Sequence, residues 1–313
     1  MKTPPLKQKR SKMKRFILTL LIPTLIAIHA NAQSLTEDDL KQIRESFTQD
    51  ASTGAIQNIL MGEKDINKLA LNHAELNSID HFFKYRVNVK GITNQRSSGR
   101  CWMFTSMNVL RPSVMEKFNL KDFDFSHNYL YFWDMLEKSN RFLEKAIETA
   151  SKPYDDREVT VYFNSPIEDG GVWNLYYNIA GKYGVVPAEA MPETEHSDNT
   201  SQLRALLSEK LRREAYAIRE AVNKGGKKVN MSAIMEMKKA ALKDIYRILA
   251  LCLGEPPAEF TWRYSDKTGK IVEHQYTPKQ FYDVITPADY NPDNYIMIMN
   301  DPVRDYYKIY EVD

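Results

Sequence analysis

The chain contains little of what marks disulfide-rich, fibrous or linker-like proteins. Its 313 residues include 2 cysteines, 12 glycines and 14 prolines. So few cysteines exclude a disulfide scaffold, and so little glycine and proline excludes a collagen-like or linker composition. Hydrophobic residues nevertheless make up 43% of the chain and aromatic residues 11%, which is enough for a substantial core. A wholly disordered chain is therefore excluded, and the length fits one large domain or two ordinary ones.

Positive charge is scarce outside the N-terminal segment. The formal net charge is +2, but residues 1–32 carry seven basic side chains and no acidic one. The other residues therefore hold 36 basic against 41 acidic side chains, which argues against strong nucleic-acid binding. Residues 204–228 are locally basic, but glutamates are interspersed among the lysines and arginines, a pattern typical of a solvated helix face.

The N-terminal segment, residues 1–32, has the order of a secretory signal peptide. A basic stretch precedes an apolar run over residues 16–28, and residues 30–32 (Ala-Asn-Ala) offer small side chains to a signal peptidase. The apolar run is short for a membrane span and contains Pro23, so an uncleaved anchor is disfavoured. Met13 is an alternative start. We expect cleavage after residue 32, a secreted or periplasmic location, and no membrane anchor in the mature chain.

Local patterns predict a chain that is mostly helical. Capping residues and apolar periodicity favour helices over residues 34–59, from residue 101 onward, and over 126–149, 173–183, 196–250 (broken at Gly225-Gly226) and 277–285. Alternation and turn residues favour strands at 83–89, in a hairpin over 259–276, at 295–299 and at the last residues.

Cys101 has the setting of an activated thiol. It lies where the polar loop of residues 94–100 becomes an apolar helical pattern, and Arg100 precedes it. A helix N-terminus stabilises a thiolate through its backbone N–H groups. Gln95, on the same loop, could turn its amide toward the sulfur and, with the Cys101 N–H, hold the oxyanion formed when a thiolate attacks a carbonyl. The alternative is a small buried hydrophobic residue at a helix start.

The residues around Cys101 resemble a known active site. Residues 94–104 read Asn-Gln-Arg-Ser-Ser-Gly-Arg-Cys-Trp-Met-Phe. They resemble the active-site segment of papain-like cysteine peptidases and, more narrowly, that of the bleomycin hydrolase/aminopeptidase C family. Further matching segments lie within residues 125–134, 168–173, 182–187 and 300–310.

The resemblance implies an α+β fold of papain-like architecture with a helical insertion and an incomplete C-terminal β-domain. The expected organisation is a signal peptide at 1–32, a helical nucleophile domain at 33–195, the insertion at 196–258 and the start of a truncated β-domain at 259–313.

The resemblance also implies roles for individual residues. Cys101 becomes the nucleophile and Gln95 the oxyanion-hole donor. Asp169, Gly170 and Gly171 become the substrate-binding edge along which an extended peptide pairs, because a Cβ at the glycines would block its approach. Peptides are the implied substrates, and homo-oligomers are possible because some family members form hexamers. No metal-ligand spacing or cofactor fingerprint occurs in the sequence, so neither a metal nor a cofactor is expected.

The remaining cysteine and the tryptophan beside the nucleophile are expected to be structural. Papain-like secreted enzymes place a disulfide between positions that correspond to Ser98 and Glu168, so both partners are absent and Cys101 has no competing neighbour. Cys252, between two leucines, is expected in the core. Trp102 is expected to anchor the nucleophile helix by packing.

The resemblance further requires a histidine base and an asparagine, in a Thr-His-Ala-Met-type strand and an Asn-Ser-Trp-Gly-type turn. Neither motif occurs in the sequence. Downstream of the glycine pair lie His196, interpreted as a solvated loop residue, and His274, on the predicted hairpin. We therefore expect a truncated chain without its catalytic His and Asn. Two functions stay open: an exported cysteine aminopeptidase, or an incomplete relative that only binds peptides or partner subunits.

Overall fold

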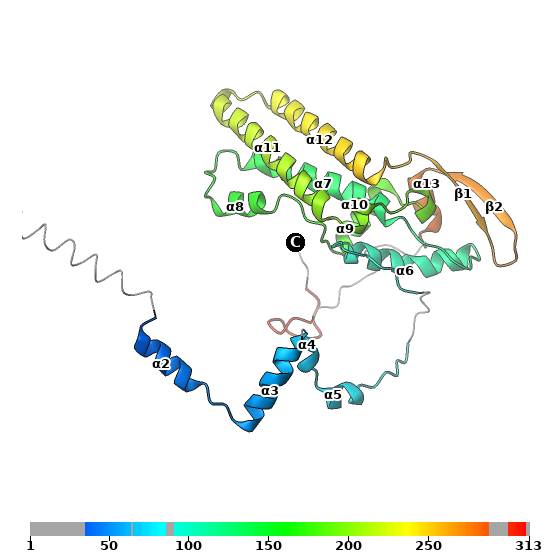
Figure 1. Ribbon diagram of the computed structural model, residues 1–313. Helices are drawn as coiled ribbons and strands as arrows, with labels where there is room; N and C mark the ends of the chain where they lie inside the picture. Colours follow the sequence, from blue (N-terminus) through cyan, green and yellow to red (C-terminus); the bar gives the residue numbers. More distant parts are fainter. Residues whose placement is uncertain (1–34, 64, 86–90, 288–299, 311–313) are drawn as a thin grey trace, which may run out of the picture. The chain divides into compact units, whose positions relative to one another are not determined.

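The computed structural model describes residues 35–63, 65–85, 91–287 and 300–310. The chain divides into two compact units, Met1–Lys84 and Tyr85–Asp313 (Figure 1). In the described ranges, no helix combines the length and the apolar character that a membrane span requires. The predicted boundaries at residues 195 and 258 stay predictions.

The first unit consists of short helices, and the helical pattern predicted over residues 34–59 is confirmed, with a break between two helices. Its helices are α2 (Glu37–Ser46), α3 (Ala51–Gly62), α4 (Ile66–Leu69) and α5 (His73–Ser78). Thr36 caps α2 and forms a capping box with Asp39. The Asp50 carboxylate then accepts a hydrogen bond from the Thr53 N–H at 2.6 Å and starts a new helix. An aspartate prefers such an N-cap to a helix interior, which explains the break.

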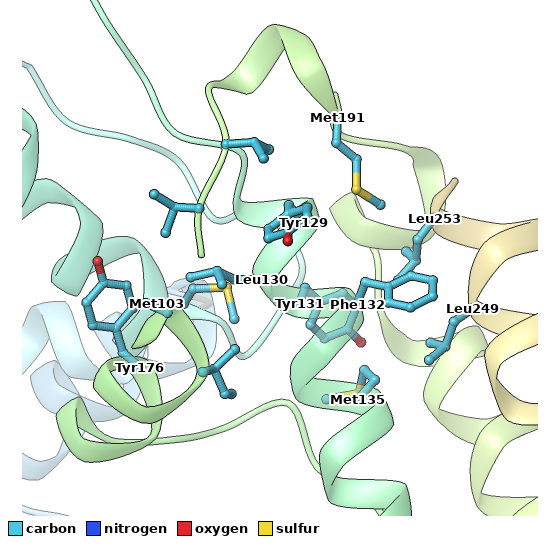
Figure 2. Packing of buried hydrophobic residues seen from close by; sticks show 14 of the residues in the cluster. Met103, Tyr129, Leu130, Tyr131, Phe132, Met135, Tyr176, Met191, Leu249 and Leu253 are labelled. Atoms are coloured by element: carbon cyan, nitrogen blue, oxygen red, sulfur yellow. The ribbon is translucent and has the colours of Figure 1, made fainter. Parts of the chain in front are cut away.

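The core of the second unit forms around α7 (His127–Glu148), which Ser126 caps and which confirms the helix predicted over residues 126–149. Helices α6 (Cys101–Lys117) and α9 (Trp173–Tyr183) pack against one part of α7. Figure 2 shows Met103 of α6 and Tyr176 of α9 beside Leu130 of α7, with Leu249 of α12 beyond Phe132. These side chains are buried, and so they fix the helix that begins at Cys101.

The predicted insertion forms a long helical pair. It consists of α11 (Ser201–Gly225) and α12 (Met231–Leu253), which lie side by side along α7 (Figure 1). Leu203, Leu207 and Leu211 recur every four residues on α11 and are buried, so one apolar stripe faces the core. The helix ends at the glycine pair predicted to break it, where Gly226 has a φ of 48°.

The predicted hairpin is also present. Strands β1 (Phe260–Ser265) and β2 (Ile271–Tyr276) pair antiparallel, and α13 (Pro278–Ile285) follows with Thr277 in a capping box. Gly184 ends α9 with a φ of 79°, and a Cβ there would lie 2.2 Å from the Pro278 carbonyl carbon, so only glycine allows this approach. The remaining short helices are α8 (Arg157–Asn164), η1 (Ala188–Ala190), α10 (Glu195–Asp198) and η2 (Gly226–Lys228).

The other predicted strands do not appear in the described residues. Residues 84 and 85 form a bend, and residue 83 belongs to no regular element. Residues 86–89 of the predicted segment lie outside the described residues. The strand predicted at 295–299 also lies outside them. Residues 300–310 form turns instead of a further strand. A strand needs a pairing partner, and within the described chain β1 and β2 pair with each other alone.

Candidate active site

Cys101 is the first residue of α6 and carries an exposed, free thiol. The prediction that a polar loop leads into a helix at this residue is confirmed, and the alternative of a buried hydrophobic residue is wrong. The N–H groups of a first helical turn have no partners within the helix and point toward its N-terminal end. The thiol therefore lies where a negative charge is stabilised by the backbone.

Arg100 anchors the loop from inside the protein. Its side chain is fully buried and forms an ion pair with Glu193, with an N–O distance of 2.8 Å. Its Nε donates to the Ser98 hydroxyl at 3.0 Å, and its guanidinium lies over the rings of Phe104 and Tyr131. Because Glu193 balances the charge of Arg100, Arg100 fixes the start of α6 and does not offer a free charge to the thiol.

Gln95 closes the loop on itself. Its amide Nε2 donates to the Ser98 carbonyl at 2.5 Å, and the Ser98 hydroxyl donates to the Gln95 carbonyl at 2.6 Å. An amide nitrogen carries two hydrogens, so one N–H of Gln95 is left for a further acceptor. The role of Gln95 in an oxyanion hole stays a prediction.

Gly171 and Trp102 form a close packing contact. A Cβ at Gly171 would lie 2.5 Å from the indole ring of Trp102, which is buried as predicted. A Cβ at Gly170 would meet nothing within 4 Å, and Gly170 is exposed. The structural need for glycine is therefore at position 171, while the exposed Gly170 has free space on its Cβ side. Its pairing with a peptide stays a prediction.

Asp169 turns its carboxylate inward, away from the predicted substrate edge. The carboxylate accepts hydrogen bonds from the Gly99 N–H at 2.7 Å and the Thr200 hydroxyl at 2.6 Å, and forms an ion pair with Arg204 at 3.3 Å. Burial raises the pKa of this carboxyl, but the bonds from Thr200 and Gly99 and the charge of Arg204 lower it overall. Asp169 is therefore an ionised acceptor that holds the loop before Cys101.

Lys138, on α7, binds the backbone of the segment that contains the glycine pair. Its Nζ donates to the carbonyls of Glu168 at 2.9 Å and Gly170 at 2.7 Å, and to the Asp134 carboxylate at 2.7 Å. Burial raises the pKa of Asp134 to about 7, against the opposing charge of Lys138. No local pattern predicted Lys138, Thr200 or Arg204 in this site, because they lie far along the chain from Cys101.

The described histidines take other places. His127 is buried and stacks on Phe104 with the ring centroids 3.5 Å apart. Burial first, and then the charges of two arginines, lower its pKa to about 3. His196 lies in the short helix α10, not in the solvated loop expected, and His274 is exposed on β2 as predicted. Within the described part of the second unit, Cys101 forms no hydrogen bond with His127, His196 or His274.

Two further features of the second unit bear on the site. Cys252 on α12 is half-buried where the core was expected, and burial raises the pKa of its thiol.

Across the described ranges, no group of three or more His, Cys, Asp or Glu side chains is arranged to hold a metal ion. The position of the exposed Cys101 thiol at the start of α6 supports thiol chemistry.

Comparisons with known proteins define the class. A family model described as "Peptidase C1-like family" matches residues 34–313. Bleomycin hydrolase of Rattus norvegicus is 37% identical over 256 residues, covering 80% of this chain and 56% of that protein. Aminopeptidase C of Listeria monocytogenes is 42% identical over 229 residues, covering 73% and 50%. The crystal structure of PepW from Lactobacillus rhamnosis HN001 superposes with a TM-score of 0.75 at 34% identity, covering 84% of this chain and 58% of that one.

The chain belongs to the Peptidase C1-like family. The resemblance to papain-like cysteine peptidases of the bleomycin hydrolase/aminopeptidase C type and the α+β fold class are thereby confirmed. The chain spans about half the length of these curated relatives.

Proposed function

We propose that the chain carries the nucleophile region of a cysteine aminopeptidase. The observation that supports this most directly is the exposed thiol of Cys101 at the first residue of α6, with buried anchors on either side of it. Relatives named aminopeptidase C and bleomycin hydrolase support the same class of reaction. Peptides with a free N-terminus are the proposed substrates.

In the proposed reaction, the Cys101 thiolate attacks the carbonyl carbon of the first peptide bond and forms a C–S bond. The carbonyl oxygen becomes an oxyanion, held by the Cys101 backbone N–H and the second amide hydrogen of Gln95. Collapse of this intermediate breaks the C–N bond, and the amine leaves with a proton from a general acid. Water then cleaves the thioester, which releases the amino acid and restores the thiol.

Covalent labelling tests the proposal. A peptidyl epoxide is expected to alkylate Cys101 at least about tenfold faster than Cys252, because attack on the oriented epoxide requires an activated thiol and the pKa of the Cys252 thiol is raised by burial. Mass spectrometry of the two cysteine peptides measures both rates in one sample, and Cys101→Ser is the control. Equal rates at the two cysteines would contradict the proposal.

A second candidate function is peptide binding without turnover. The positions of the second unit's described histidines favour it: His127 is buried against Phe104 and His274 is exposed on β2, whereas a thiol peptidase needs an imidazole base beside its thiol. Fluorogenic aminoacyl substrates separate the two: turnover that Cys101→Ser abolishes supports the aminopeptidase, whereas labelling without turnover supports the binding function.

We also propose that the chain is exported. The basic stretch, apolar run and Ala-Asn-Ala segment of residues 1–32 support this. Expression of the full chain in a bacterial host should give a periplasmic or secreted protein that begins at Gln33, as measured by fractionation and intact mass. A cytoplasmic protein that keeps residues 1–32 would contradict the proposal.

We further propose that copies of the chain associate with one another. The insertion exposes large apolar side chains on α11 and α12, among them Leu206, Tyr216 and Leu251. Exposed apolar groups of this kind favour contacts between copies. Light scattering after size-exclusion chromatography should give a mass that is a multiple of the monomer, and a monomer at all concentrations would contradict it.

A further inference from the structure

A single residue, Asp169, contacts the chain on both sides of Cys101. Its carboxylate accepts a hydrogen bond from the backbone N–H of Gly99 at 2.7 Å, two residues before the nucleophile. Its backbone carbonyl accepts a hydrogen bond from the indole Nε1 of Trp102 at 2.9 Å, directly after the nucleophile. The side chain and the main chain of one residue therefore bracket Cys101.

The contact between Gly99 and Asp169 leaves no space for the loop before Cys101 to move closer to Asp169. A Cβ at Gly99 would lie 2.4 Å from the Asp169 Oδ1 atom, so glycine is what lets the loop approach this closely. On the other side, Trp102 is buried against Gly171, which follows Asp169 by two residues. The loop before Cys101 and the helix after it are thus both packed on residues 169–171.

The insertion fixes Asp169 in turn. Thr200, which is buried just before α11, donates its hydroxyl to the Asp169 carboxylate at 2.6 Å. Arg204, one turn further along, lies 3.3 Å from the same carboxylate. The Ser97 N–H also donates to the Asp198 carbonyl at 2.9 Å, which ties the loop backbone to the segment before α11. Hydrogen bonds to an ionised acceptor are the stronger kind.

We propose that Asp169 is a positioning residue, which fixes Cys101 for attack through Gly99 and Trp102, and that Thr200 and Arg204 of the insertion take part by fixing Asp169. This inference rests on the proposed function, because it concerns how fast Cys101 attacks. A shift of about 1 Å in a reacting atom can cost about 100-fold in rate. The contacts of Asp169 therefore govern the rate of attack and not the affinity for a peptide.

Saturation kinetics of alkylation on the full chain test this assignment. Asp169→Ala should lower the maximal rate of Cys101 labelling by a peptidyl epoxide, kinact, by about 10- to 100-fold, with the half-saturating concentration KI little changed. Labelling of Cys252 in the same sample should not change. Glu168→Ala is the matched control, because Glu168 precedes Asp169 and pairs with the same Arg204 at 2.9 Å, yet its side chain is exposed. It should keep the wild-type kinact.

Thr200→Val is the milder variant. It removes the hydroxyl bonded to Asp169 and keeps the side-chain shape, so kinact should fall by at least about twofold. If circular dichroism shows that Asp169→Ala does not fold, the kinact of Thr200→Val tests the positioning role of Asp169 instead. An unchanged kinact in the folded variant, or an equal fall in Glu168→Ala, would overturn the assignment.

Hydrogen exchange gives a readout that does not depend on thiol chemistry. Amide exchange in residues 95–102 should become faster in Asp169→Ala and Thr200→Val but not in Glu168→Ala. If exchange responds while wild-type Cys101 is labelled no faster than Cys252, the proposed function fails and the positioning role of Asp169 stands. If wild-type Cys101 is labelled fast and neither kinact nor exchange responds, the positioning role fails and the proposed function stands.

Discussion

Gly170 and Gly171 show how two identical neighbouring residues meet different physical demands. The sequence pattern gives both the same role, an open edge for an extended peptide. In the structure, Gly171 lies under the indole of Trp102, and a Cβ there would be 2.5 Å from the ring. At Gly170 a Cβ would meet nothing within 4 Å. One glycine therefore serves packing of the nucleophile helix, while the other has free space on its Cβ side.

This difference predicts opposite behaviour of two alanine variants. Gly171→Ala should lower the free energy of unfolding by about 1–3 kcal/mol, because the added methyl group forces Trp102 out of its packing. Gly170→Ala should change it by less than about 0.5 kcal/mol. Urea unfolding measures both. If Gly170 forms the substrate edge, Gly170→Ala should have a higher KI for the peptidyl epoxide and an unchanged stability. Equal stability of the two variants would contradict the packing role of Gly171.

At the scale of elements, α11 turns one apolar stripe toward the core. Leu207 faces the core and is fully buried, whereas its neighbour Leu206 is 47% exposed. The stripe matters for the site because α11 begins at Ser201, next to Thr200, and carries Arg204 in its first turn. Packing of the insertion on α7 thus sets where the partners of Asp169 lie.

The two adjacent leucines provide a matched pair of variants. Leu207→Ala should lower the free energy of unfolding by about 2–5 kcal/mol, since it leaves a cavity between α11 and the core. Leu206→Ala should change it by about 0.5 kcal/mol or less, because the side chain is half in water. Thermal or urea unfolding checks the difference. A similar loss in both variants would mean that α11 does not pack on α7 through this stripe.

The elements also show which part of the structure the sequence could predict. Helix α9 begins after a glycine pair and ends at Gly184, and both local signals give its bounds correctly. The hairpin and the break of the insertion at Gly225 and Gly226 follow from equally local signals. The contacts of Asp169 with Thr200 and Arg204 do not, because they join residues 31 and 35 positions apart that only the packed fold brings together. Local patterns located Cys101; its supporting contacts required tertiary structure.

At the scale of the whole molecule, two buried ionisable groups on α7 make stability respond to pH in opposite directions. His127 is held neutral, with its pKa lowered from 6.5 to about 3. Asp134 is held partly protonated, with its pKa raised from 3.8 to about 7. Unfolding returns the pKa of each of these groups to its ordinary value. The folded protein therefore binds one proton fewer than the unfolded chain at His127 and one more at Asp134 over much of the range from pH 4 to 6.5.

Each group contributes a slope of up to about 1.4 kcal/mol per pH unit to the free energy of unfolding. The stability that neutral His127 provides is present above pH 6.5 and lost as the pH falls toward 3, because the unfolded histidine gains a proton. The stability that Asp134 provides is present below pH 3.8 and lost as the pH rises through about 7. The two slopes oppose each other in the wild-type protein.

Single substitutions should therefore expose one slope at a time. His127→Gln removes the rising slope, so between pH 4.5 and 6 its stability relative to the wild type should decrease as the pH rises. Asp134→Asn removes the falling slope, so its relative stability should increase with pH over the same interval. Urea unfolding at pH 4.5, 5.25 and 6 measures both differences, and the double variant should have nearly the wild-type slope. Parallel pH profiles for the wild type and both variants would show that neither group is buried as the structure describes, and the packing of α7 against α6 would then need revision.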